Sequence, residues 1–448
     1  MPLIPGPSAP PAIQLLRWIR NPSRLLSECQ ARFGDTFAIR LPGLPRQFVV
    51  LAAPEAIREV FAMSSDASHA GKANGILRPF LGKHSLLLLD GAEHLRQRKM
   101  MMPAFHGERM HAYGETMMDL AHQSLDDWPI GRAFPVHRSL QWIALQVILR
   151  TVFGVEPGPR HARLADALTR GLEVAGQPLL MLPVVQRDLG RFSPWGRYRR
   201  LASHASALLR DEIRRGRTGG TSGRTDILAL LLDARDESGR ALDEDEVHDE
   251  LMTLLVAGHE TTATALAWAL RWLLDDAPLV ARLRDEIASA QGDPAKVAKL
   301  ELLDATVKET LRLQPVIALV GRVLQTGARI GGIDFPAGTA VAPCIYLVHR
   351  RASLYPDPAR FAPDRFATFK PSPWEWIPFG GGLRRCIGAA FATYEMKMVL
   401  ASVLPRVDAR LATQRVAPAR RSVTITPSGG LPIVVTARRP RAEKNRAA

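Results

Sequence analysis

Cysteine is scarce in this sequence, and its spacing excludes two common structural devices. Only three cysteines occur in 448 residues, Cys29, Cys344 and Cys386, and no two of them form a CxxC pair. A disulfide framework or a cysteine-based zinc site needs thiols at characteristic spacings. The sequence therefore predicts a protein of a reducing compartment in which each thiol stands alone.

Long apolar runs are missing as well. No stretch approaches the roughly 20 apolar residues that span a bilayer. The lead at residues 1–11 is rich in proline and lacks the apolar segment of a signal peptide. We therefore expect a cytoplasmic protein without a transmembrane anchor. The apolar segment Leu179–Val185 could be a lid or could touch a membrane surface, and the sequence leaves this open.

Positive charge is in excess. Lys and Arg number 59 against 44 Asp and Glu, which gives a formal net charge of +15. Such a balance can indicate nucleic acid, a membrane surface or an acidic protein partner. The charge is spread along the chain, and the short clusters at 214–217 and 438–441 do not alternate with aromatic residues. The pattern favours an acidic protein partner and no nucleic acid.

Helical periodicity dominates the chain, with a smaller share of strand-like segments. No internal repeat or clean boundary divides it, so we expect one domain over residues 1–448, with a disordered basic tail at 438–448. The main expected elements are a helix over Ala12–Arg32, a hairpin of Phe37–Leu41 and Gln47–Leu51, a helix over Pro54–Met63, an irregular loop over 64–90, helices over 107–215, a helix over Ala389–Leu404, and a final hairpin of Ser422–Thr426 and Leu431–Thr436.

The longest helix is expected over Asp243–Leu274, where Asp243 and Glu246 match a capping box. Its middle contains Ala-Gly-His-Glu-Thr-Thr at 257–262, which is unusual for a helix that must be buried. Gly258 could serve close packing, and the Thr261 hydroxyl could bond to a carbonyl one turn earlier. Each residue has such an explanation singly, but a functional site explains the acid, glycine and hydroxyls together.

Two shorter helices carry paired polar residues. Asp90 and Glu93 match a second capping box, and His94 and Arg98 then share one helix face, as two donors suited to a carboxylate. Glu309 and Arg312 are spaced i, i+3 on a helix that ends before Pro315. Surface ion pairs are the more frequent explanation of both patterns.

One ten-residue stretch, Phe379–Gly388, places a single cysteine between glycines. Arg384 and Arg385 precede Cys386 and would favour its thiolate, the form that binds metal. Phe379 could shield the sulfur, and the glycines allow the backbone to approach a bulky ligand. A tight turn around an ordinary buried cysteine is the simpler alternative.

The stretch matches F-x-x-G-x-R-x-C-x-G at every fixed position, and it resembles the haem-binding loop of the cytochrome P450 superfamily. Four further elements in the same order resemble that family: His94/Arg98, the 257–262 segment, Glu309/Arg312 and Pro363–Phe366. The resemblance implies a mainly α fold with a small β lobe, a single triangular domain with a long central helix, and a thiolate-ligated haem b.

The resemblance also implies roles for individual residues. Cys386 would be the metal ligand, and Gly258, Glu260 and Thr261 would leave room for dioxygen, relay protons and orient the oxygen. The haem would be held by His94, Arg98, Arg322 and Arg384 at its propionates and flanked by Phe379 and Gly388. The substrate pocket would include Leu254, Ala257, Val316, Ile317, Val320 and Leu431. Glu309, Arg312 and Arg365 would form a structural triad.

The implied reaction is hydroxylation or epoxidation of a hydrophobic molecule, such as a fatty acid or terpenoid, with dioxygen and two electrons from NAD(P)H. The electrons would arrive through an acidic ferredoxin or flavodoxin and its reductase, with Arg96, Lys99 and Arg385 as candidate contacts. Two alternatives stay open: a peroxide-driven or non-oxidative enzyme on the same fold, and a carrier of haem or a hydrophobic ligand.

Overall fold

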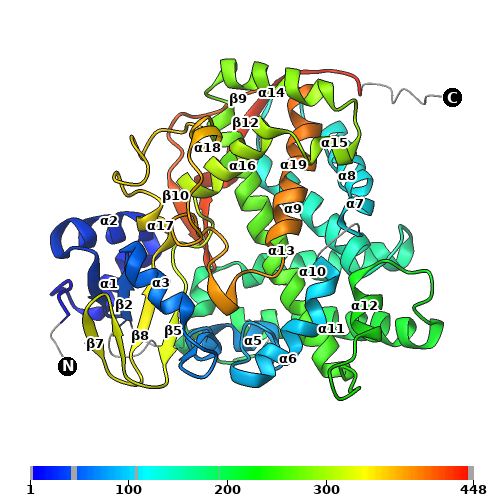
Figure 1. The fold of residues 1–448 in the computed structure, drawn as a ribbon. Helices are drawn as coiled ribbons and strands as arrows, with labels where there is room; N and C mark the ends of the chain where they lie inside the picture. Colours follow the sequence, from blue (N-terminus) through cyan, green and yellow to red (C-terminus); the bar gives the residue numbers. More distant parts are fainter. Residues whose placement is uncertain (1–3, 42–47, 106–108, 191, 442–448) are drawn as a thin grey trace.

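Helices make up most of the chain in the computed structural model, which describes residues 4–41, 48–105, 109–190 and 192–441 (Figure 1). The strands gather mainly at the side where the N-terminal part lies, and the helices fill the rest. This arrangement confirms the expected mainly α architecture with a small β lobe. The helices are α1 (Pro11–Arg20), α2 (Pro22–Phe33), α3 (Pro54–Ala62), α4 (Ala70–Ala73), α5 (Arg78–Leu81), α6 (Gly91–Met101), α7 (Arg109–Ala112), α8 (Gly114–Asp126), α9 (Val136–Val147), α10 (Pro159–Ala175), α11 (Pro194–Gly219), α12 (Ile227–Asp233), α13 (Glu244–Leu273), α14 (Ala277–Ser289), α15 (Pro294–Val297), α16 (Glu301–Leu313), α17 (Ile345–Val348), α18 (Arg365–Thr368) and α19 (Ala389–Arg406).

Twelve strands within the described ranges form four small sheets. The largest has the order β1-β2-β8-β5-β3, the second β4-β12-β9, and the other two are the pairs β6-β7 and β10-β11. The strands are β1 (Thr36–Ile39), β2 (Phe48–Leu51), β3 (Ser68–His69), β4 (Ala133–Pro135), β5 (Arg322–Leu324), β6 (Ala328–Ile330), β7 (Ile333–Phe335), β8 (Ala340–Pro343), β9 (Val407–Leu411), β10 (Pro418–Arg421), β11 (Thr424–Pro427) and β12 (Pro432–Arg438).

The long helix α13 begins where its capping residues predict. Asp243 accepts a hydrogen bond from the Glu246 amide at 2.8 Å, and the Glu246 carboxylate accepts one from the Asp243 amide at 2.9 Å. These two bonds satisfy amides that the first helical turn leaves free. The helix packs against α9, α11, α16 and α19. It therefore runs through the centre of the helical part and has buried side chains along most of its length.

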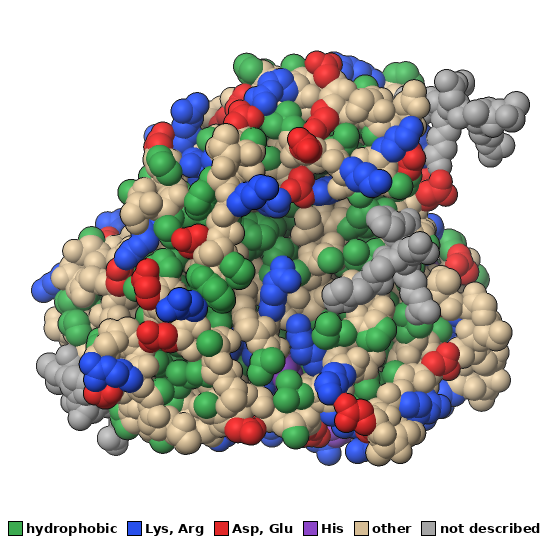
Figure 2. All heavy atoms as spheres, viewed as in Figure 1, with side chains coloured by type: hydrophobic (Ala, Val, Ile, Leu, Met, Phe, Trp, Pro, Cys, Tyr) green, Lys and Arg blue, Asp and Glu red, His purple; other side chains and the backbone are tan. Residues whose placement is uncertain are grey.

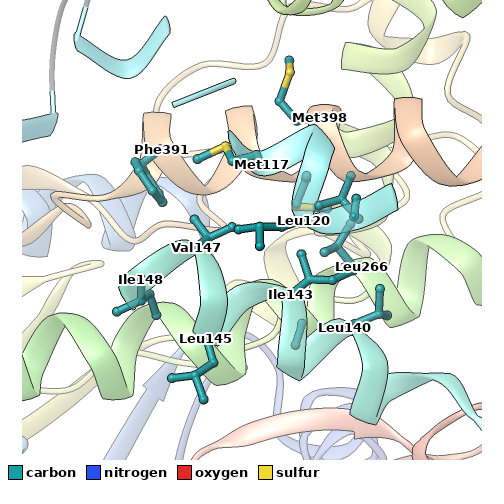
Figure 3. Packing of buried hydrophobic residues seen from close by; sticks show 14 of the residues in the cluster. Met117, Leu120, Leu140, Ile143, Leu145, Val147, Ile148, Leu266, Phe391 and Met398 are labelled. Atoms are coloured by element: carbon teal, nitrogen blue, oxygen red, sulfur yellow. The ribbon is translucent and has the colours of Figure 1, made fainter. Parts of the chain in front are cut away.

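The main hydrophobic core joins α8, α9, α13 and α19. Figure 3 shows Met117 and Leu120 of α8, Ile143 of α9, Leu266 of α13 and Met398 of α19 gathered in one cluster. Each fully buried aliphatic side chain contributes about 1.5–3 kcal/mol. This core fixes α19 against α13, and Cys386 lies three residues before α19 begins.

The first hairpin forms as expected, with β1 and β2 antiparallel and Phe37 opposite Val50. Its predicted turn, Pro42-Gly43, lies outside the described residues. The proline-rich lead is bound to this sheet, because the Ala38 amide donates to the Pro5 carbonyl at 2.8 Å. Ile4 is buried in the same cluster.

Two boundary predictions were wrong. The helix expected over Ala12–Arg32 is split into α1 and α2, because Pro22 cannot continue the first helix and Asn21 caps the second. The final hairpin does not form either. The segment β11 pairs with β10, whereas β12 pairs with β4 and β9, because Gly429, Gly430 and Leu431 all adopt positive φ and redirect the chain to another sheet.

The loop expected over 64–90 contains β3, α4 and α5, so it is more ordered than its composition indicates. The basic tail is ordered through residue 441: Arg438 ends β12, Arg439 pairs with Asp408 at 2.8 Å, and Arg441 pairs with Asp119 at 2.7 Å. Residues 442–448 lie outside the described ranges.

The apolar segment after α10 is divided between the interior and the surface. Leu180 and Met181 are buried beside Phe80, Trp195 and Tyr198, whereas Leu179 and Val184 project outward. Across the ranges that the structure describes, no helix is both long and apolar enough to cross a bilayer.

Candidate functional site

The cysteine loop is a tight turn held by its own backbone. The Cys386 amide donates to the Phe379 carbonyl at 2.9 Å, and the Arg385 amide donates to Gly382 at 3.1 Å. Gly388 then caps α19. These bonds fix the position of Cys386 between Phe379 and the start of a buried helix.

Gly381 and Gly382 of this loop lie against Phe61 of α3, a contact that the sequence did not predict. A Cβ at Gly381 would meet the Phe61 ring at 2.2 Å, and one at Gly382 would meet the Phe61 carbonyl at 2.1 Å. Gly382 also has a φ of +62°. Both glycines therefore allow the loop to pack closely on α3, in addition to any approach to a ligand.

Cys386 is exposed and lines a hollow of about 410 Å³. Burial raises the pKa of its thiol, while the Gly388 amide, Arg98 and Arg385 lower it. Arg384 does not take part, because its guanidinium bonds to the Leu86 and Leu89 carbonyls and to Asp90. Of the two arginines expected to favour the thiolate, only Arg385 acts on Cys386, and α6 supplies the second cation.

Three predicted ligand-holding residues converge on one pocket. His94 of α6, Arg322 of β5 and Arg384 of the cysteine loop line it together. Burial and the neighbouring Arg384, Arg98 and Arg322 lower the pKa of His94 to about 3. Burial lowers the pKa of Arg322 and of Arg384 to about 10, with repulsion from Arg384 in the first case and from Arg98 in the second. His94 Nδ1 is buried and has no hydrogen-bond partner among the described residues. The pocket has the donor groups and the unbalanced positive charge that carboxylates would satisfy.

Asp90 anchors this pocket instead of capping its helix. It stands at the start of α6, but its side chain makes no capping bond there. It accepts hydrogen bonds from the Gly71 amide at 2.8 Å and the Lys72 amide at 3.0 Å, and it pairs with Arg384. The second predicted capping box is therefore wrong, and Asp90 joins α4 to the cysteine loop.

One stripe of α13 is not covered by protein. Leu254, Gly258 and Thr261 are half-buried and Ala257 is exposed, although residues on both sides of this stripe are buried. The Thr261 hydroxyl donates to the Ala257 carbonyl at 2.5 Å, so its oxygen keeps lone pairs for a second partner. A Cβ at Gly258 would lie 3.3 Å from Ile148 Cδ1, so close packing also applies here.

Glu260 is surrounded by polar side chains from three other positions. Gln141 of α9 donates to its Oε2 at 2.7 Å, Thr264 donates to Oε1 at 3.4 Å, and Arg421 of β10 lies 3.2 Å from Oε2. Burial raises the pKa of Glu260, and Arg421, Gln141 and Thr264 oppose this shift. Neither Gln141 nor Arg421 belongs to a recognisable motif, so sequence patterns did not identify these two residues.

Glu309, Arg312 and Arg365 form a buried network. Arg312 donates to both Glu309 oxygens at 2.6 and 2.8 Å, and Arg365 donates to Glu309 Oε1 at 3.0 Å. Arg312 also donates to the His349 carbonyl at 2.8 Å. In turn, His349 Nε2 accepts a hydrogen bond from the Ile377 amide at 2.8 Å, two residues before Phe379. This chain of bonds supports the cysteine loop, and sequence reasoning missed His349.

The predicted pocket residues do not all lie in comparable places. Ile317 and Val320 are half-buried, and Val316 is buried at the edge of the main core. Leu431 is fully buried in that core. We no longer expect Leu431 to contact substrate, because an accessible pocket residue should retain some exposed surface.

The described residues fit a thiolate-ligated haem on three observations. A lone cysteine opens onto a hollow, and a stripe of the central helix is uncovered. Beside the cysteine loop, three donors converge on one pocket, and of the two arginines only Arg384 pairs with a described carboxylate. When bound, the haem would be held by Cys386 through its iron and by His94, Arg322 and Arg384 through its propionates. Arg98 lines the hollow at Cys386 rather than the pocket of the other three.

Comparisons with known proteins agree with this fit. The profile of the family named Cytochrome P450 matches residues 4–430. Cytochrome P450 135B1 of Mycobacterium tuberculosis is 42% identical over 442 residues, which cover 98% of this chain and 92% of that protein. Cytochrome P450 138 of the same organism is 34% identical and covers 97% of both chains.

A solved structure shows the same fold. The cyanobacterial CYP120A1 with retinoic acid bound superposes with a TM-score of 0.86, at 26% identity, over 98% of this chain and 100% of that one. The family match, the relatives and the shared fold together show that this chain belongs to the cytochrome P450 family and is a haem-thiolate monooxygenase.

Proposed function

We propose that this monooxygenase hydroxylates or epoxidises a hydrophobic molecule such as a fatty acid or terpenoid. The observation that carries the proposal is the uncovered stripe of α13, where Leu254 and Ala257 adjoin Thr261. Ile317 and Val320 add further aliphatic surface that is only half-buried. A pocket of this composition gains affinity mainly from apolar contact. The retinoic acid held by CYP120A1, an apolar chain with one carboxylate, is a ligand of the same kind.

When bound at Cys386, the haem would supply the dioxygen chemistry, which a thiolate ligand favours. The chain's own residues manage water and protons. Thr261, whose hydroxyl hydrogen is engaged by Ala257, can accept a hydrogen bond and so orient a neighbouring donor. Glu260, one residue earlier, is the candidate group for carrying protons inward from the Gln141 side.

We propose that the electrons come from an acidic ferredoxin or flavodoxin that binds around the hollow at Cys386. Arg98 and Arg385 line this hollow together with Lys308 and Lys397, which both already pair with Asp304. Figure 2 shows Lys and Arg side chains gathered around a depression near the middle of the face it draws. Such a surface steers an acidic carrier by long-range attraction. Arg96 is a poor candidate, because it already pairs with Asp236 and Glu246.

Charge reversal tests the carrier site. Arg385→Glu should slow reduction of the holoenzyme by an acidic ferredoxin at low ionic strength, and the effect should shrink in salt because screening acts over about 10 Å at 0.1 M. Lys99→Glu is the matched control, since Lys99 is exposed but pairs with Glu237 away from the hollow. An equal effect of both variants would contradict this docking site.

Ligand titration tests the substrate class. Fatty acids and terpenoids should displace the water at the haem iron and shift the absorption spectrum, whereas sugars and amino acids should not. Turnover should then require the ferredoxin, its reductase and NAD(P)H. Spectral shifts with polar compounds alone would refute the hydrophobic class, and turnover with peroxide but not with the reductase system would refute the electron route.

A further inference from the structure

The acid of the central helix is paired with a residue from the far end of the chain. Arg421 closes β10, and the turn after it is fixed by a positive φ at Ser422 and by the Thr424 hydroxyl, which donates to the Arg421 carbonyl at 2.8 Å. Trp268 of α13 donates to the Ile425 carbonyl at 2.8 Å. The hairpin that carries Arg421 is therefore attached to the same helix as Glu260.

Arg421 lies against Glu260 without a hydrogen bond. Its Nε lies 3.2 Å from Glu260 Oε2, but the geometry misses that of a hydrogen bond, and this nitrogen has no other bond to a described residue. Gly176, at the end of α10, makes space for it: a Cβ there would lie 3.0 Å from Nε. Arg421 thus lies where the C-terminal hairpin, the end of α10 and the central helix meet.

This ion pair has no evident value for stability. Glu260 is 16% exposed and Arg421 is 32% exposed, and removing two charges this far from water costs free energy that their attraction repays only in part. An apolar pair would fill the space as well. The position of the acid beside Thr261 gives the pair a different use.

We propose that Arg421 is a positioning residue that holds Glu260 as a carboxylate beside Thr261, so that Glu260 can accept and pass protons toward the oxygen site. The inference rests on the proposed role of Glu260 in monooxygenation. Without the guanidinium, only the hydrogen bonds from Gln141 and Thr264 would oppose burial, and the balance would shift toward the neutral carboxyl, which cannot accept a proton.

The other groups around Glu260 do not titrate in the relevant range. His137 of α9 lies 3.6 Å from Oε1, and burial lowers its pKa to about 3. Burial also lowers the pKa of the adjacent His259 to about 4. Gln141 and Thr264 are uncharged. Above pH 5 both histidines are therefore neutral, so among the described residues that face Glu260, Arg421 is the one whose charge acts on the carboxyl.

The test compares the ferric holoenzyme with Arg421→Gln, Glu260→Gln and the double variant by thermal unfolding between pH 5 and pH 8. A raised carboxyl pKa makes the folded state bind more protons than the unfolded state, so stability falls as pH rises. Arg421→Gln should extend this fall to higher pH. The decrease in unfolding temperature caused by Arg421→Gln should be larger at pH 8 than at pH 5. When Glu260 is also replaced by Gln, this difference between the two pH values should disappear.

Turnover supplies a second measurement. In Arg421→Gln the pH midpoint for product formed per NAD(P)H should rise by about one unit, a tenfold change in the ratio of neutral to ionised carboxyl. Arg421→Lys should restore the profile. Arg420→Gln, which removes a charge from the same strand without touching Glu260, should leave it unchanged.

The proposal would be overturned if Arg421→Gln lowered the unfolding temperature equally at every pH, or if Glu260→Gln did not change this effect. It would also be overturned if Arg421→Gln left the pH midpoint of product formation unchanged. The unfolding result does not depend on oxygen chemistry. An enzyme without monooxygenase activity would refute the proposed function while the pairing result still stood.

Discussion

Replacing His349 should weaken the cysteine loop from a distance. Its Nδ1 lies 3.2 Å from the Arg312 carbonyl and its Nε2 accepts from the Ile377 amide at 2.8 Å, so Nδ1 carries the proton and the ring is neutral. Burial lowers the pKa of His349 to about 3. The ring thus connects the Glu309–Arg312 network to the segment that leads into Phe379.

Two substitutions separate the two bonds. His349→Asn can reach the Arg312 carbonyl but not the Ile377 amide, and His349→Gln can reach the amide but not the carbonyl. Each variant leaves one buried group unpaired, which costs about 1–3 kcal/mol. Only the Asn variant leaves the Ile377 amide without its acceptor. In that variant, a larger fraction of the reduced carbon monoxide complex should therefore show the histidine-type absorption band. The Gln variant should keep the thiolate band.

The same variants should change acid stability. The unfolded His349 takes up a proton near pH 6.5, and the folded one does so only near pH 3. The neutral His349 ring therefore contributes fully to the free energy of unfolding above pH 6.5. Below that pH, this contribution falls by about 1.4 kcal/mol per pH unit. Urea unfolding at pH 7 and pH 5 should show a smaller loss for the Gln variant than for the native protein. His204→Gln, on the exposed face of α11, is the control. Parallel losses in all three proteins would refute the role assigned to His349.

Two further outcomes follow from the site. Thr261→Ala should keep haem and its thiolate band but form less product per NAD(P)H and release more peroxide. The control Thr262→Ala should keep product formation coupled to NAD(P)H use. Coupled turnover in Thr261→Ala would show that Thr261 has another role. Arg384→Leu should speed transfer of haem to an acceptor protein by about ten- to a hundredfold, because a charged hydrogen bond is worth about 1.5–3 kcal/mol. The control Arg385→Leu should not speed this transfer. Equal transfer rates in the two variants would show that Arg384 does not bind a propionate.

Local patterns predicted the elements whose signals are contained in a few neighbouring residues. The Asp243/Glu246 capping box, the β1–β2 hairpin and the long helix all formed as expected. For Asp90, contacts distant in sequence outweigh the local pattern. Its spacing to Glu93 matches a capping box, but Arg384 and the 71–72 amides, which are distant in sequence, bind its carboxylate instead.

Long-range contacts explain what the sequence could not show. The final hairpin failed because three successive residues with positive φ transfer the chain to another sheet, and only two of the three are glycines. Arg421 and His349 act through partners at least 28 positions away in the chain, so no short motif marks them. The role of Gly381 likewise depends on the Phe61 ring of α3.

The most direct test of the central claim is the absorption difference spectrum of the dithionite-reduced protein with carbon monoxide. A red-shifted Soret band typical of thiolate ligation, lost in Cys386→Ser, is the predicted result. A histidine-type band in the native protein, or no haem signal at all, would contradict the assignment of Cys386 as the haem ligand.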